Sequence, residues 1–456
     1  MAKTKKQMGV QQILLHPDKE TEAILTYLCE QSGKLYNMGV YFARQMLFKT
    51  GKILTGKFDL VYEKSIGKSI IAKSLPSTPA QQTLLSVAES FKSYKKLRKC
   101  WFEGQITDKP RPPKYLKGSK LFKVAYPNSG GQRPRIKEGQ LHFSLGLTVR
   151  RWFGVKSFSL PFPTNLEGRK IKEWTILPKN GALYLEVSYE IPEQKPQEQV
   201  GNEALSIDLG TSSNLAACVD TLGNSFLIDS RAMKSFNQYW NKQVATRKEG
   251  KPQGYWDKWL DRVTRKRNHR IRDGINKAAR LIINHCLKHK INTLVLGWNE
   301  GFKQNSNMGR LNNQEFVQIP LGKLKDRLSQ LCDLHGIRLE ITEEAYTSKA
   351  SYLDGDSLPK FGQKPTGWKA SGRRVKRGQY LSANRSIVNA DLNGSANIMR
   401  KVARKLGLDL SRLGRRSLTT VARIRLWELP QFNLSAESPR LMTGECQYYI
   451  CWAYCC

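Results

Sequence analysis

Three acidic stretches in the second half of the chain carry side chains that suit metal-dependent chemistry. They lie at residues 205–210, 337–344 and 389–398, and present the carboxylates of Asp208, Glu343, Glu344 and Asp391. Carboxylate oxygens are the ligands that Mg²⁺ prefers, whereas His and Cys favour softer metals. Two Mg²⁺ ions about 3.5 to 4 Å apart can activate a water and hold the leaving oxygen of a phosphodiester. If folding brings the stretches together, they predict a site for phosphodiester hydrolysis.

The elements around these acids predict an α/β domain. Residues 205–219 are expected to form a hairpin with Asp208 near its tip, because apolar residues flank the acid and Gly210 relieves the backbone at the turn. A central strand at 294–297, a helix at 319–334 and a strand at 337–341 follow. A lone Asp-x-Gly most often only closes a strand. Its repetition with two further acidic stretches favours convergence at one edge of a sheet.

The three motifs together resemble a known nuclease family. Ile-Asp-Leu-Gly at 207–210, Tyr-Thr-Ser-Lys at 346–349 and Asn-Ala-Asp-Leu-Asn-Gly-Ser-Ala-Asn-Ile at 389–398 are similar to the split RuvC domain of TnpB proteins. These are transposon-encoded RNA-guided nucleases related to type V CRISPR effectors. The resemblance covers residues 201–402 strongly and the N-terminal part weakly. It implies a guide RNA, a double-stranded DNA target and Mg²⁺, with no membrane, no small-molecule cofactor and a prokaryotic cytoplasmic location; the oligomeric state stays open.

The middle acid of the site has more than one candidate. Gly297 stands where the commoner TnpB arrangement carries an acid. Glu300 follows three residues later on a loop, and its side chain can reach the site only if the end of the strand bulges. Glu343 and Glu344 are neighbours on an extended stretch and face opposite ways, so at most one can reach the metals. Some TnpB relatives look as if they carry a rearranged acid just before Tyr-Thr-Ser, which matches Glu344. The predicted catalytic and metal-binding residues are Asp208, Glu344 and Asp391, with Glu343 and Glu300 as alternatives.

The interval between the second and third motifs departs from the family pattern. Many TnpB proteins bind structural zinc there through two Cys-x-x-Cys pairs, but no cysteine occurs between Cys332 and Cys446. No structural zinc is therefore expected in the insert at 349–385. The crowded cysteines at 446–456 lack a Cys-x-x-Cys pair, which leaves their role open. Asn393 and Asn397 read equally as turn and capping residues or as residues that support the acids.

Charge indicates the class of partner. The 456 residues include 76 Lys and Arg against 38 Asp and Glu, a formal net charge of +38 spread along the chain. A protein with so much positive charge is expected to bind a polyanion such as nucleic acid, with contacts spread along much of its surface. A membrane-surface protein is the rival, but no long apolar run or amphipathic anchor supports it.

Candidate nucleic-acid contacts come from three segments. The helix expected at 78–103 has a basic side that is either solvated or in contact with nucleic acid, and its start resembles the TnpB helix near the transposon-adjacent DNA motif. The helix expected at 264–290 begins with arginines that oppose the macrodipole, so phosphate contact explains them better than helix stability. The insert contributes further arginines. The candidates are Gln81, Gln82, Lys92, Lys96, Arg265, Arg267, Arg270, Arg272, Arg373, Arg374 and Arg377.

The N-terminal half predicts helices and short strands. An amphipathic helical pair is expected at 21–50, and alternating runs between 121 and 191 predict a small β-barrel. The fold class is therefore α/β plus β-barrel: an RNase H-like (RuvC) nuclease domain preceded by a wedge barrel with an inserted recognition domain. The expected domains are the wedge-like barrel at 1–20 and 106–195, the helical recognition domain at 21–105, the RuvC-like domain at 201–348 and 386–402, the insert at 349–385, and a basic C-terminal tail at 403–456 that is disordered or RNA-associated.

These inferences predict an RNA-guided DNA endonuclease that cleaves complementary DNA next to a short motif by metal-dependent hydrolysis. One alternative is a nuclease-inactive, RNA-guided DNA-binding regulator on the same scaffold, against which the intact Asp208 and Asp391 argue. Another is a guide-free nuclease of the RNase H type, against which the long N-terminal portion argues.

Overall fold

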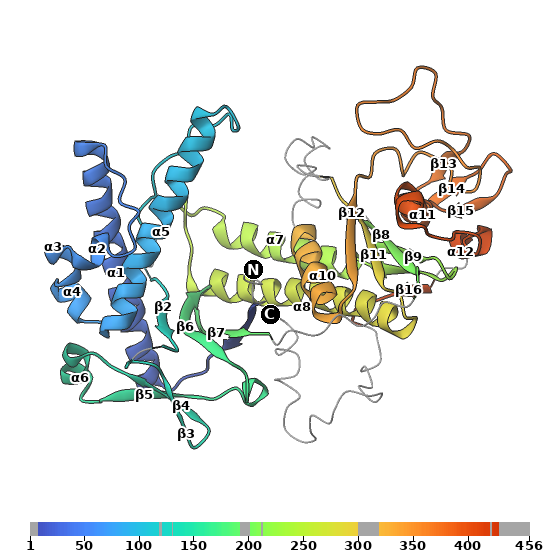
Figure 1. Ribbon diagram of the computed structural model, residues 1–456. Helices are drawn as coiled ribbons and strands as arrows, with labels where there is room; N and C mark the ends of the chain where they lie inside the picture. Colours follow the sequence, from blue (N-terminus) through green and yellow to red (C-terminus); the bar gives the residue numbers. More distant parts are fainter. Residues whose placement is uncertain are drawn as a thin grey trace. The chain divides into compact units, whose positions relative to one another are not determined.

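A computed structural model describes residues 8–117, 121–129, 131–191, 201–210, 213–299, 319–419 and 422–427. The chain divides into two compact units, one built mainly from residues 1–193 and the other from residues 194–444. Figure 1 labels the elements of both. No helix in the described residues is long and apolar enough to cross a membrane.

The first unit is built on two long helices. α1 (Lys19–Thr50) starts at Asp18, whose side chain accepts a hydrogen bond of 2.8 Å from Thr21 N, and ends at Gly51 in the left-handed conformation. The predicted helical pair at 21–50 is thus wrong: this stretch is one helix of 32 residues, because no residue inside it breaks the 3.6-residue period. The other helices are α2 (Asp59–Tyr62), α3 (Lys64–Gly67), α4 (Ile70–Lys73), α5 (Ser77–Phe102) and α6 (Leu147–Phe153).

Two open antiparallel sheets accompany these helices. The first has the order β1 (Met8–Leu14), β7 (Ala182–Glu190), β6 (Ile171–Lys179), β2 (Val124–Pro127), and the second the order β3 (Arg135–Lys137), β4 (Gln140–Ser144), β5 (Ser157–Pro161). Neither closes on itself, so the predicted barrel is not found in the described residues. The physical reason is packing. Apolar side chains of the sheets, such as Trp174 and Phe143, share one core with Leu28 and Phe91 of the helices. Because the helices cover the sheets, the sheets need not close into a barrel to bury their apolar faces.

The second unit contains a six-stranded mixed sheet, which confirms the predicted mixed α/β class. Its hairpin of β8 (Ala204–Leu209) and β9 (Asn214–Asp220) matches the hairpin expected at 205–219, and β10 (Ser225–Asp229) continues it antiparallel. β11 (Thr293–Gly297) pairs parallel to β8, and β12 (Arg338–Thr342) pairs parallel to β11. The order is β12 (Arg338–Thr342), β11 (Thr293–Gly297), β8 (Ala204–Leu209), β9 (Asn214–Asp220), β10 (Ser225–Asp229), β16 (Ala422–Ile424).

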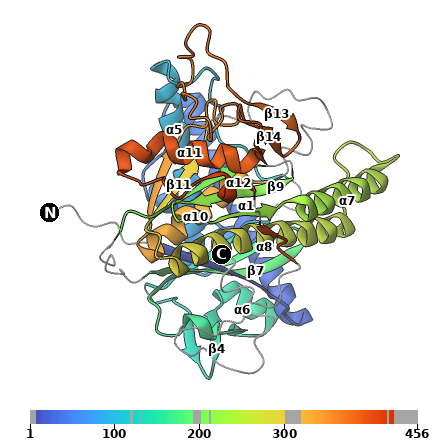
Figure 2. The ribbon, with the colours of Figure 1, turned by 90° about the vertical axis from the view of Figure 1, so that its right-hand side faces the viewer.

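Helices cover both faces of this sheet. Leu205 and Ile207 pack into a core with α8 (Lys258–Lys288) and α10 (Leu321–His335). Ala204 of the alternate face packs against Ile398 of α11 (Ala390–Leu406). Figure 1 shows α8 and α10 on one side of the sheet and α11 on the other, and Figure 2 shows α7 (Arg231–Lys248) running beside α8. Because side chains alternate along a strand, Asp208 lies on the α11 face.

The C-terminal segment differs from the predicted tail at 403–456. Helix α11 continues to Leu406, α12 spans Arg415–Thr419, and β16 pairs in parallel with β10 at the edge of the sheet. Leu426 is buried in the same core as α8. A three-residue strand is too short to leave a periodic pattern in the sequence, so only the tertiary structure reveals it. The cysteines at 446–456 lie outside the described residues.

Candidate active site

Asp391 lies in the first turn of α11, where the cap orients it. Asn389 is the N-cap residue, and its side chain accepts hydrogen bonds of 3.0 Å from the backbone N–H groups of Asp391 and Leu392. The acid is therefore delivered by a helix start, as the sequence predicts. One carboxylate oxygen, Oδ1, pairs with Arg374 Nη2 at 2.9 Å, and the other, Oδ2, accepts a bond of 2.7 Å from Asn214 Nδ2.

Asp208 projects from β8 toward the start of α11. The negative charges of Glu344 and Asp391 both act on its carboxyl group, so the structure brings the three predicted acids into one neighbourhood. Burial, and then these two charges, raise the pKa of Asp208 well above its ordinary value, while Arg374 lowers it. Gly394 makes the approach possible, because a Cβ at that position would lie 2.5 Å from Asp208 Oδ2.

Glu344 fills the space left by a missing side chain on β11. A Cβ built on Gly297 would lie 2.8 Å from Glu344 Cγ and Oε1, so an acid at 297 and the side chain of Glu344 would compete for the same volume. The backbone of Glu344 is held by Asn299, whose Oδ1 accepts from Glu344 N at 3.1 Å. Burial raises the pKa of Glu344 to about 7, partly opposed by Lys401.

The two alternative acids take other positions. Glu343 faces away and pairs with Lys401 Nζ at 3.0 Å, and it also accepts a bond of 3.2 Å from Phe361 N. These contacts lower the pKa of Glu343 against the effect of burial. The structure thus separates the neighbouring glutamates as an extended backbone requires. Glu300 lies outside the described residues.

Asn393 and Asn397 connect the segment after Glu344 to α11. Both are fully buried, and their Nδ2 atoms donate to Ala350 O at 2.8 Å. Asn397 also donates to Thr347 O at 2.9 Å, and Asn393 Oδ1 accepts from Tyr352 N at 2.9 Å. The sequence allows two interpretations of these asparagines, as turn and capping residues or as residues that support the acids. The contacts fit the second interpretation. They hold the second acidic stretch against the helix that carries the third.

Sequence reasoning missed two residues beside Asp391. Asn214 lies within the hairpin expected at 205–219, and Arg423 lies in the tail that the sequence predicts to be disordered or RNA-associated. Arg423 Nη1 donates to Asn214 Oδ1 at 3.0 Å, and Asn214 in turn donates to Asp391. The position of Asn214 just after Asp208 and the turn was a signal that could have pointed to it. Arg423 has no such signal, because nothing local marks β16.

The donor set fits a hard divalent cation. All three acids supply only oxygen ligands, and burial raises the pKa of both Asp208 and Glu344. Within the described part of the chain, however, no three His, Cys, Asp or Glu side chains are grouped closely enough to hold a metal ion. The carboxylate of Asp391 is engaged by Arg374 and Asn214.

The insert is cross-linked by carboxylates. Asp356 Oδ2 accepts from Ser351 N at 2.7 Å and from Ser371 N at 3.1 Å, and Asp354 Oδ2 accepts from Ala383 N at 2.8 Å. These bonds tie together segments that are far apart within the insert. Two strands of the insert, β13 (Arg373–Lys376) and β14 (Gln379–Leu381), form a small sheet with β15 (Ile387–Asn389), which follows the insert, and this sheet presents Arg374 to Asp391.

The predicted basic contacts on α8 need a correction. The helix starts at Lys258, capped by Asp257, whose side chain accepts from Leu260 N at 2.8 Å. The arginines at 265–272 therefore lie beyond the first turn, where the macrodipole no longer acts, and the predicted conflict with it is wrong. Arg267 donates to Asn237 Oδ1 at 2.7 Å and stacks on Trp240, and Arg270 lies over Phe236. These two side chains join α8 to α7.

The remaining basic candidates lie on helix and sheet surfaces. Arg265 and Arg272 are half-buried on α8, and Gln82 is half-buried on α5. The exposed candidates are Gln81, Lys92 and Lys96 on α5, and Arg373, Arg374 and Arg377 of the insert.

Comparisons with known proteins agree with this architecture. Residues 186–301 match the family model OrfB_IS605, described as a probable transposase. The chain is 23% identical over 433 residues to the TnpB-like protein ORF457 of Acidianus two-tailed virus, covering 85% of each chain. Its fold is similar to that of the protein in a cryo-EM structure of a Cas12f1–sgRNA–target DNA complex, with a TM-score of 0.51, 16% identity, and coverage of 83% of this chain and 82% of that one. The predicted similarity to TnpB proteins is confirmed.

Proposed function

We propose that this protein is an RNA-guided DNA endonuclease of the TnpB type. The observation that carries the proposal is the convergence of Asp208, Glu344 and Asp391, which come from three distant segments, on one face of the mixed sheet. The order and directions of the strands support an RNase H-like (RuvC) domain. Similarity to ORF457 and to a guide-RNA-bound Cas12f1 chain supports delegation of sequence recognition to RNA.

Each of the three acids has a proposed role. Asp208, Glu344 and Asp391 would hold Mg²⁺ through their carboxylate oxygens, and Arg374 would hold the Asp391 carboxylate in the absence of the metal. When bound, two such ions supply an activated water and stabilise the leaving oxygen of the phosphodiester. Asn299, Asn393 and Asn397 keep the segment of Glu344 in place through the backbone contacts described above.

The basic surfaces are assigned to nucleic acid. With a net charge of +38, the chain needs many phosphates to relieve its self-repulsion. The exposed cations of α5 and of the insert are proposed phosphate contacts. In this proposal, unit one serves as the wedge and recognition domains expected at 1–20, 21–105 and 106–195, and unit two serves as the nuclease domain with its insert.

The test begins with the RNA that copurifies with the protein. That RNA is sequenced, and plasmids carrying its complement beside a randomised flank are offered with Mg²⁺. Cleavage that needs RNA, complement and Mg²⁺ is expected, with RNA binding but no cleavage by Asp208→Ala and Asp391→Ala. Retained cutting by both variants would place the active site elsewhere. DNA binding without cutting by the wild-type protein would favour the regulator, and cutting without RNA would favour a guide-free nuclease.

A further inference from the structure

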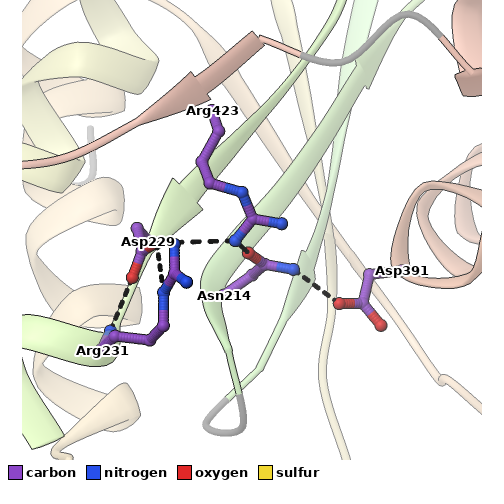
Figure 3. A network of polar contacts seen from close by, with 5 residues as sticks. All are labelled: Asn214, Asp229, Arg231, Asp391 and Arg423. Carbon is purple, nitrogen blue, oxygen red and sulfur yellow. Dashed lines mark hydrogen bonds and ion pairs between the residues drawn. The ribbon is translucent and has the colours of Figure 1, made fainter. Parts of the chain in front are cut away.

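The C-terminal strand β16 brings an arginine into the polar network around Asp391. Figure 3 shows Arg423 between Asp229 and Asn214, with Asn214 directed toward Asp391. Arg423 pairs with Leu227 in the register of β16 and β10, so the strand pairing determines where its side chain starts. Its Nη1 lies 3.0 Å from Asn214 Oδ1 and 3.5 Å from Asp229 Oδ2.

Asn214 can satisfy both neighbours in only one orientation of its amide. A guanidinium only donates and an ionised carboxylate only accepts, so Oδ1 must face Arg423 and Nδ2 must face Asp391. The reverse orientation would place the amide oxygen against the carboxylate and the NH₂ group against the guanidinium. Asn214 is 5% exposed, which leaves little water to compensate either loss.

The guanidinium of Arg423 is also held by Asp229. Asp229 is 6% exposed and accepts from Arg231 N at 2.7 Å and Arg231 Nε at 2.8 Å, so its carboxylate is fixed next to the guanidinium of Arg423. The chain of contacts therefore runs from Arg231 through Asp229, Arg423 and Asn214 to Asp391. It orients the Oδ2 side of Asp391, while Oδ1 pairs with Arg374.

We infer that Arg423 is a positioning residue for the metal site, acting through the amide of Asn214 on the carboxylate of Asp391. This inference rests on the proposed function, because it assigns Asp391 to metal binding. Groups that orient a metal-ligating carboxylate typically change metal affinity by about 10-fold to 100-fold when removed. Arg423→Ala is therefore expected to weaken metal binding by about this factor while leaving RNA binding unchanged.

The experiment measures Mn²⁺ binding by electron paramagnetic resonance on the purified protein–RNA complex. The Asp391→Ala complex supplies the background of Mn²⁺ held by RNA. Arg423→Ala, Asn214→Ala and the double variant are compared, with Arg416→Ala of α12 as the control for loss of one exposed positive charge in the same segment. We expect each single variant to raise the dissociation constant, the double variant to match Asn214→Ala, and Arg416→Ala to behave as wild type.

Cleavage gives the second readout. The Mg²⁺ concentration at half-maximal rate should rise in Arg423→Ala, with most of the rate recovered at saturating Mg²⁺, and Arg423→Lys should restore much of the affinity because it keeps a donor. The role of Arg423 would be overturned by an unchanged Mn²⁺ affinity in Arg423→Ala. It would also be overturned if the increase in dissociation constant of the double variant equalled the product of the increases of the two single variants. Neither result would bear on the metal site itself. A wild-type complex that binds no more Mn²⁺ than Asp391→Ala would overturn the metal site of the proposed function.

Discussion

At the scale of single residues, the space beside Gly297 is occupied by the side chain of Glu344. Under the proposed function, Glu344, which follows β12, therefore supplies the acid that the commoner TnpB arrangement carries at 297. Glu343, one residue away, is committed to Lys401. The two glutamates thus have different expected roles although they are chemically identical.

The first prediction separates these glutamates. Glu344→Gln keeps the shape of the side chain but removes the charge that holds Mg²⁺, so cleavage should fall below detection in a single-turnover assay with bound RNA. Glu343→Gln is the matched control and should retain most of the rate, as should Glu300→Gln. Loss of cleavage in Glu300→Gln with activity retained in Glu344→Gln would show that the rearranged site is wrong.

The second prediction concerns the space at Gly297. Gly297→Ala should destabilise the protein by about 1 to 3 kcal/mol, a usual cost of overpacking. The reason is that the new Cβ would lie 2.5 Å from Ile398 Cδ1 and 2.8 Å from Glu344 Oε1. Denaturant unfolding measures the effect. Gly322→Ala in α10 is the control, because its Cβ meets no atom within 4 Å and alanine favours helix; equal effects of the two substitutions would contradict the packing argument.

At the scale of elements, carboxylates that accept backbone hydrogen bonds hold the insert at 349–385 together. Asp356 accepts from the backbone N–H groups of Ser351 and Ser371, and Asp354 accepts from that of Ala383. Hydrogen bonds with the Ser351 side chain and with Ala383 N lower the pKa of Asp354 against the effect of burial.

The third prediction tests the cross-link. Limited proteolysis of the protein–RNA complex should cut the insert faster in Asp354→Ala and Asp356→Ala, because each variant leaves backbone N–H groups without their acceptors. Treatment with EDTA should leave the proteolysis pattern of the wild-type insert unchanged. Asp409→Ala, which removes an exposed acid that binds only Ser411 nearby in sequence, is the control. A chelator-sensitive insert would indicate that a metal holds it after all.

At the scale of the whole molecule, the net charge bears on the proposed association with nucleic acid. The 76 basic and 38 acidic residues are spread over both units, and Arg267 and Arg270 of α8 contact α7. A protein of this kind gains affinity by releasing counterions from phosphates.

The fourth prediction follows from counterion release. A plot of log affinity against log salt concentration should be steep, with a slope of about −0.9 per phosphate contacted on duplex DNA and about −0.7 on single strands. Filter binding between low and physiological salt measures the slope. Asp208→Ala should show the same slope as wild type, since the substitution removes no cation that contacts phosphate. A flat plot would contradict the RNA-guided function.

Residue types and local periodicity were enough to predict the three acidic stretches, the β8–β9 hairpin, the strands around 294–297 and 337–341, and the basic character of the chain. Only the folded chain shows that the N-terminal sheets pack on helices without closing, and that Arg423 reaches Asn214 from 209 residues away. Such contacts depend on register and on the fit of side chains across distant segments. A local sequence pattern does not predict contacts between distant segments, because the free energy that stabilises these contacts is gained only when the segments pack together.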